Sequence, residues 1–232
     1  MKFDCTYHKS LDALHVGCEQ PRAYFVPFSD KAVALTGRRG ESDRFVSLCG
    51  EWSFTFYPGY DKADDFLSEP FPLPNSETIA VPMSWQSALG RGYDTPNYTN
   101  VDYPFPIDPP HVPNENPCGL YQKRVFVSET MLNGKSLYIN FEGVDSCFYL
   151  FVNNTFVAYS QVSHMTSEID LTPYVHVGYN DFSVLVFKWC DGSYLEDQDK
   201  FRFSGIFREV YLLVRDKVHV RDIEIKAYLS EG

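Results

Sequence analysis

One nearly continuous apolar run, Phe182-Ser-Val-Leu-Val-Phe-Lys-Trp189, decides the fold of this chain. A short apolar run rich in β-branched and aromatic residues is typical of a strand that is buried on both faces. Two other segments alternate apolar and polar residues, as half-buried strands do, from Trp52 to Phe56 and from Leu137 to Phe141. Many short strands separated by turn signals predict an all-β sandwich.

A tight hairpin can also be located. The apolar runs 147–152 and 155–160 flank Asn153-Asn154, a pair that accepts positive φ and therefore suits a two-residue connection. Val210 to Val214 adds a further apolar strand, whereas helical periodicity is weak along the whole chain.

A proline-rich stretch lies between Asp94 and Pro117. Proline fixes φ and removes a backbone donor, so this stretch is not a central strand. We expect a long, stiff, ordered excursion, and such loops are often functional. Its seven prolines are Pro96, Pro104, Pro106, Pro109, Pro110, Pro113 and Pro117.

Composition narrows the class of protein. The formal charge of −11 over 232 residues argues against a nucleic-acid binder and against docking on anionic lipid. The six cysteines are scattered without metal-ligand spacing, so we expect reduced, structural thiols. No signal-peptide core and no apolar stretch of membrane-spanning length occurs, which predicts a cytoplasmic protein.

An acidic loop follows the decisive run. It places Glu196, Asp197 and Asp199 beside the aromatic residues Phe201 and Phe203. Carboxylates accept hydroxyl protons or bind a hard cation, and ring faces pack on sugar C–H groups, so the loop could hold a sugar or an ion. The alternative is a solvated acidic loop. Asp197 and Asp199 do not form a glycosidase pair, because one loop cannot supply two opposed faces for a sugar ring.

Six sequence blocks, taken together and in order, carry a resemblance. They are Val81-Pro-Met-Ser-Trp-Gln86, Tyr98-Thr-Asn-Val101, Pro109-Pro-His-Val-Pro-Asn-Glu-Asn-Pro117, Phe141-Glu-Gly-Val-Asp-Ser146, Asp191-Gly-Ser-Tyr-Leu-Glu-Asp-Gln-Asp199 and Ser204-Gly-Ile-Phe-Arg208. The chain resembles the N-terminal sugar-binding domain of family 2 glycoside hydrolases, in particular the large bacterial β-galactosidases. The resemblance implies a jelly-roll sandwich over residues 47–216, preceded by an arm over 1–46. It also implies that residues 217–232 begin an immunoglobulin-like domain.

The resemblance further implies a supporting role in hydrolysis of terminal β-galactosides. Both catalytic glutamates of the family lie on a (β/α)8 barrel, so no catalytic residue is expected in this chain. Asn100, Val101 and Asp199 match positions that contact the galactose, and Asp199 matches a residue that shares a sodium ion with the barrel. Gln161 and Asp191 match ligands of a peripheral magnesium ion, although the arm shows no match for the other ligands. A homo-oligomer is implied for the full enzyme.

Other interpretations stay open at this point. Asn100 could cap a turn, and Asp199 could pair with Arg202 or Arg208. The chain could be a free-standing carbohydrate-binding module, a scaffold for subunit contacts, or the equivalent domain of a β-glucuronidase or β-mannosidase. Trp52, Trp85 and Trp189 could stack on a sugar, but we expect them in the core.

Overall fold

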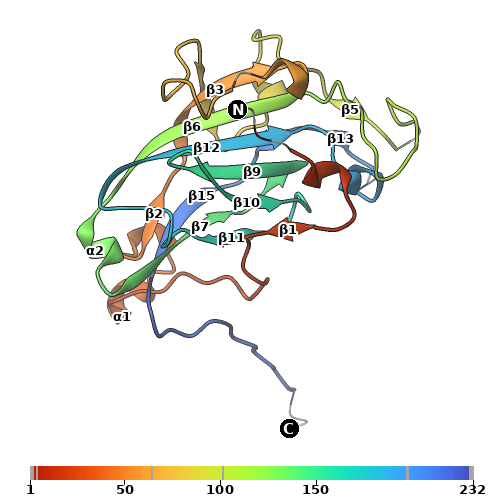
Figure 1. Cartoon of the computed structure of the whole chain (residues 1–232). Coiled ribbons are helices and arrows are strands. Elements are labelled where there is room, and N and C mark those ends of the chain that lie inside the picture. The colour runs from red at the N-terminus through yellow and green to blue at the C-terminus, as the bar shows by residue number, and fades with distance from the viewer. Residues whose placement is uncertain (1–2, 4, 64, 101, 197–198, 230–232) are drawn as a thin grey trace.

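The fold is a β-sandwich of the jelly-roll type, as predicted (Figure 1). The computed structural model describes residues 3, 5–63, 65–100, 102–196 and 199–229. One layer is a seven-stranded antiparallel sheet. In spatial order its strands are β1 (His15–Val16), β10 (Thr155–Ser160), β9 (Cys147–Val152), β12 (Gly178–Phe187), β6 (Cys118–Val127), β3 (Gly50–Tyr57) and β4 (Glu77–Val81).

The second layer is a four-stranded sheet that packs against the first. Its strands, in spatial order, are β11 (Ser167–Asp170), β7 (Lys135–Phe141), β15 (Val210–Asp216) and β2 (Phe45–Ser47). Apolar side chains of both sheets meet in one core, among them Trp52, Ile139, Val184 and Leu212. Burial of this apolar surface is the main source of the sandwich's stability.

The apolar run that begins at Phe182 forms most of β12 and lies in the middle of the larger sheet. β12 pairs with β6 on one side and with β9 on the other. Val184 and Val186 face the core between the sheets, whereas Leu185 and Phe187 belong to a second apolar cluster on the outer face. The prediction of a strand buried on both faces is therefore confirmed. The hairpin prediction is confirmed too, because Asn153 and Asn154 have φ values of 50° and 62°.

Two short ladders extend the sandwich beyond its main sheets. β5 (Asn97–Tyr98) pairs with β13 (Phe201–Arg202), and β8 (Val144–Asp145) pairs with β14 (Gly205–Ile206). The helices are single turns: α1 (Lys31–Ala34), α2 (Glu129–Leu132), and the 3-10 turns η1 (Tyr7–Lys9), η2 (Arg39–Glu41), η3 (Tyr60–Lys62), η4 (Trp85–Ser87) and η5 (Asp191–Tyr194). Within the described residues, no helix is long and apolar enough to cross a membrane.

The N-terminal segment lies along both layers. Phe3 stacks on Phe156 and His8 stacks on Phe187, so this end covers the outer face of the larger sheet. Further on, Arg22 pairs with Glu168 on β11. Residues 217–229 form no strand and run as an extended segment, drawn in blue toward the C-terminus in Figure 1. Within this segment Arg221 still contacts Glu168 on β11.

Glu168 ties both chain ends to the smaller sheet. Its carboxylate is buried and is surrounded by the guanidinium groups of Arg22, Arg215 and Arg221. Burial acts to raise the pKa of Glu168, but the hydrogen bond from Arg22 and the three positive charges outweigh it and hold the pKa below its usual range.

We predict that Glu168→Gln destabilises the chain by about 3–5 kcal/mol, because the buried arginines lose the charge that compensates them. Urea unfolding at neutral pH measures the loss. Asp181→Asn removes a partly exposed partner of the exposed Arg124 and serves as the matched control, with little expected change. Equal effects of the two substitutions would contradict this role of Glu168.

Candidate functional site

The candidate site forms where two segments about a hundred residues apart meet. The proline-rich excursion contributes β5, and the loop after β12 contributes β13. In their ladder Tyr98 lies opposite Phe201, and Asn97 lies opposite Arg202. This ladder therefore connects the excursion to the loop after β12.

Buried polar contacts join the two segments. Lys188, which is 4% exposed, donates from Nζ to Asp94 Oδ2 at 2.5 Å and to the Thr95 carbonyl at 3.0 Å. The Asn116 amide donates to the Trp189 carbonyl at 2.7 Å and accepts from the Trp189 N–H at 3.0 Å. Because unpaired polar groups are costly in the interior, these contacts fix where the excursion runs.

Arg202 lies buried beneath the site. Its Nε donates to Thr99 Oγ1 at 3.2 Å, and its Nη2 donates to the Ser193 carbonyl at 3.0 Å. Arg208 instead donates to the His164 carbonyl. Among the described contacts, neither arginine pairs with Asp199, which had been one interpretation of that residue.

Asn100 and Asp199 come together at the surface. The Tyr98 hydroxyl donates to Asp199 Oδ1, and Asn100 Nδ2 donates to the same hydroxyl at 3.2 Å. Both candidate sugar-binding side chains are exposed. Val101 and Asp197, which were also singled out in the sequence, lie outside the described residues.

The two described carboxylates of the acidic loop, Glu196 and Asp199, lie in different surroundings. Glu196 turns inward, where it accepts from the Ser163 N–H at 2.9 Å and from the Ser163 hydroxyl at 2.5 Å. It is therefore engaged in fixing the loop, whereas Asp199 faces solvent. Sequence reasoning did not single out Tyr98, although the residue stands in the same block as Asn100.

Gln161 and Asp191 lie together. Gln161 Nε2 is 3.5 Å from Asp191 Oδ2, and both residues are buried. Asp191 Oδ1 is buried without a hydrogen-bond partner. Burial raises the pKa of Asp191 above its usual value, against the opposing effect of the Gln161 amide.

A further hollow has a buried carboxylate, that of Asp145, in its wall. Its volume is 270 Å³, and Phe201, Phe203 and Phe207 also line it. Burial raises the pKa of Asp145 to about 6, although Lys200, with its Nζ 3.6 Å from Asp145 Oδ2, acts in the opposite direction.

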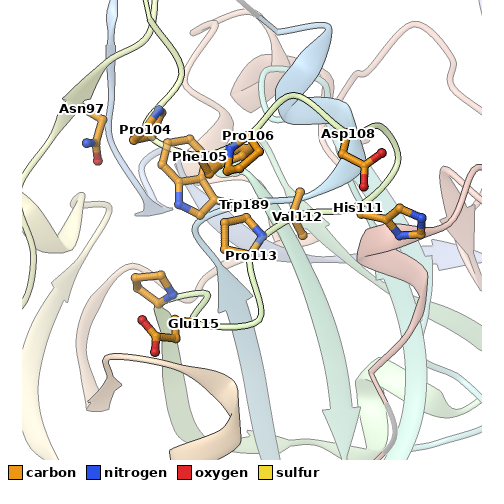
Figure 2. A pocket seen from close by; sticks show the side chains of 11 residues that line it. Asn97, Pro104, Phe105, Pro106, Asp108, His111, Val112, Pro113, Glu115 and Trp189 are labelled. Atoms are coloured by element: carbon orange, nitrogen blue, oxygen red, sulfur yellow. The ribbon is translucent and has the colours of Figure 1, made fainter.

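A larger hollow of 490 Å³ lies within the excursion. Figure 2 shows Pro104, Phe105 and Pro113 gathered around Trp189 in its wall. Neither Asn100 nor Asp199 lines this hollow.

Trp189, Trp52 and Trp85 are all buried, so the prediction that the tryptophans belong to the core is confirmed.

Comparison with known proteins assigns the family. Residues 45–216 match the family model described as glycosyl hydrolases family 2, sugar binding domain. The chain belongs to glycoside hydrolase family 2. It is 46% identical over 226 residues to a β-galactosidase of Actinobacillus pleuropneumoniae, a match that covers 97% of this chain and 22% of that protein. It is 38% identical, with the same two coverages, to a β-galactosidase of Staphylococcus xylosus.

Solved structures of other proteins share the fold. A β-glucuronidase from an uncultured Clostridium species superposes with a TM-score of 0.62 at 19% identity, covering 82% of this chain and 32% of that one. A Bifidobacterium dentium β-glucuronidase gives a TM-score of 0.56 at 15% identity, with 76% and 31% covered. The chain spans 22% of the length of the β-galactosidases from Actinobacillus pleuropneumoniae and Staphylococcus xylosus.

We predict that Asp145→Asn stabilises the chain by about 3 kcal/mol at pH 7. The folded carboxyl keeps its proton up to a pH near 6, whereas the unfolded one releases it near 4. The folded state therefore binds more protons in that window, and stability falls as the pH rises through it. The variant lacks this loss, so its advantage disappears below pH 4. Urea unfolding at several pH values measures it, and a pH-independent difference would contradict the burial of a charged Asp145.

Proposed function

We propose that this chain is the sugar-binding domain of a retaining β-galactosidase and completes the galactose subsite of an active site on another domain. The observation that carries the proposal is the convergence of Asn100 and Asp199 on the Tyr98 hydroxyl. The two β-galactosidases named above support the substrate class, since each is similar to nearly the whole chain.

The chemistry of the pair suits a sugar. A carboxylate only accepts hydrogen bonds, and an amide both accepts and donates, so together they can bind neighbouring hydroxyl groups. Each lies two residues from a strand of the short ladder between β5 and β13, and buried contacts fix that ladder, so binding immobilises little additional chain. In this proposal the catalytic acid/base and the nucleophile belong to a barrel domain outside this chain.

Cations enter the proposal as a sodium ion beside Asp199 and a magnesium ion near Gln161. Asp199 is exposed beside the proposed sugar and would supply one oxygen to sodium, while the barrel supplies the others. Asp191 offers a buried oxygen without a hydrogen-bond partner next to Gln161, which suits a hard cation. Within the described ranges no three His, Cys, Asp or Glu side chains form a metal-binding group, so other ligands would complete both sites.

The proposal extends to the setting of the full enzyme. In this proposal the full enzyme is a cytoplasmic homo-oligomer, and immunoglobulin-like and barrel domains follow this chain. The negative charge argues against nucleic acid or anionic membrane as a partner. The free-standing module is the weaker candidate, because Trp52 and Trp85 are buried in the core and Trp189, although it lines the 490 Å³ hollow, is only 5% exposed.

We predict that Asp199→Asn and Asn100→Ala, each made in the full-length protein, lower kcat/KM for a nitrophenyl β-galactoside by at least about tenfold. Loss of a hydrogen bond to a charged or buried partner is worth about that factor. Asp108→Asn, an exposed carboxylate on the same excursion, is the matched control and should leave turnover intact. Unchanged turnover in both site variants would contradict the proposal, as would hydrolysis by the isolated 232-residue chain.

We also predict that millimolar MgCl2 stabilises the chain through Asp191, by about 1–2 kcal/mol when magnesium is tenfold or more above its dissociation constant. Thermal unfolding with and without magnesium, at matched ionic strength, measures the effect. Asp191→Asn should abolish it, and Asp199→Asn should leave it unchanged. Equal stabilisation of the Asp191 variant and the parent would contradict a magnesium site there.

A further inference from the structure

Tyr98 occupies the position between the two proposed sugar-binding residues. It stands on β5 opposite Phe201, and the two rings lie 5.7 Å apart between centroids. Its neighbour Asn97 lines the hollow of Figure 2. Successive side chains of a strand point to opposite faces, so Tyr98 points to the other face, toward Asp199.

The direction of each hydrogen bond at this hydroxyl follows from the chemistry of its partners. A tyrosine hydroxyl has one proton to donate and can also accept. The Asp199 carboxylate can only accept, so the Tyr98 proton goes to Asp199. The hydroxyl oxygen then accepts from Asn100, which fixes the Asn100 amide with its nitrogen toward Tyr98. Asn100 Oδ1 is consequently turned away from Tyr98.

The resulting surface is selective. Asn100 presents a carbonyl oxygen and Asp199 presents its second carboxylate oxygen, and both are acceptors. A ligand that meets them has to bring donors, as sugar hydroxyl groups do, or a cation. Rotation of the Asn100 amide by half a turn would place a donor there and would break the bond to Tyr98.

We propose that Tyr98 is a positioning residue, an inference that rests on the proposed function: through one hydroxyl it orients Asn100 and Asp199 so that both present acceptor oxygens to galactose. Its own position is secured by the backbone ladder and by the buried contact of Arg202 with the adjacent Thr99. Tyr98 itself is 44% exposed, so its hydroxyl adds little to the stability of the fold.

The test is Tyr98→Phe in the full-length protein. The substitution keeps the ring and removes the shared hydroxyl, so Asp199 loses a donor and Asn100 loses the partner that fixes its amide. We expect kcat/KM for a nitrophenyl β-galactoside to fall about tenfold, chiefly through KM. The melting temperature should stay within about 2 °C of the parent, because the lost hydroxyl is exposed.

Tyr93→Phe is the matched control. Tyr93 lies immediately before the excursion and donates a hydrogen bond from its hydroxyl to Glu77 Oε2 at 2.9 Å, away from Asn100 and Asp199. This variant loses one hydroxyl of a partly exposed tyrosine and should keep the parental kcat/KM. A tenfold loss in Tyr93→Phe as well would assign the effect to the excursion as a whole and overturn the specific role of Tyr98.

The decisive readout places Tyr98→Phe in a background that carries both Asn100→Ala and Asp199→Asn. If Tyr98 acts through these two residues, its substitution changes kcat/KM in that background by less than about twofold. A further tenfold loss there would show that Tyr98 acts otherwise and overturn the inference. If the double variant Asn100→Ala, Asp199→Asn loses activity while Tyr98→Phe alone loses none, only the inference about Tyr98 is overturned. If the double variant keeps the parental activity, both the proposed function and the inference about Tyr98 are overturned.

Discussion

The geometry of the candidate site depends on charged groups that are buried between two distant segments. Lys188 reaches Asp94, and Arg202 reaches Thr99 and the Ser193 carbonyl. A buried pair of this kind is weak evidence for stability, because desolvation offsets much of the attraction. Removal of Asp94 would leave the buried charge of Lys188 uncompensated, so the Lys188–Asp94 pair holds the start of the excursion in place. We infer that these contacts fix where the excursion and the loop after β12 run. They thereby also fix where Asn100 and Asp199 lie.

The hydrophobic sandwich provides the rigid base for these contacts. β12 is buried on both faces and ends where Lys188 and Trp189 begin the loop toward the site. The position of the apolar strand therefore fixes where Lys188 and Trp189 lie at the edge of the core. From there the chain passes through η5 to β13, which pairs with the excursion. The rigid strand and the buried contacts together support Asn100 and Asp199. This support limits the conformational freedom of the two side chains before any ligand binds.

The sequence predicted the sandwich because its evidence is local. The run from Phe182, the alternating segments and the Asn153-Asn154 turn each reveal their structure within a few residues. The meeting of Asn100 with Asp199 could be predicted only through the resemblance. The contacts that cause it could not be predicted, because Lys188–Asp94 and Tyr98–Asp199 join residues 94 and 101 positions apart. The burial of Arg202 and Asp145 could not be predicted for another reason: a charged residue usually indicates solvent exposure, and only the fold buries these two.

The most direct test of this account is a crystal structure of the full-length protein with galactose bound. The account predicts that the Asn100 side-chain carbonyl and the Asp199 carboxylate both lie within hydrogen-bond distance of one galactose. It also predicts that the Tyr98 hydroxyl still joins the two residues behind that sugar. A galactose bound in the active site with neither Asn100 nor Asp199 in contact with it, directly or through a shared cation, would contradict the central claim.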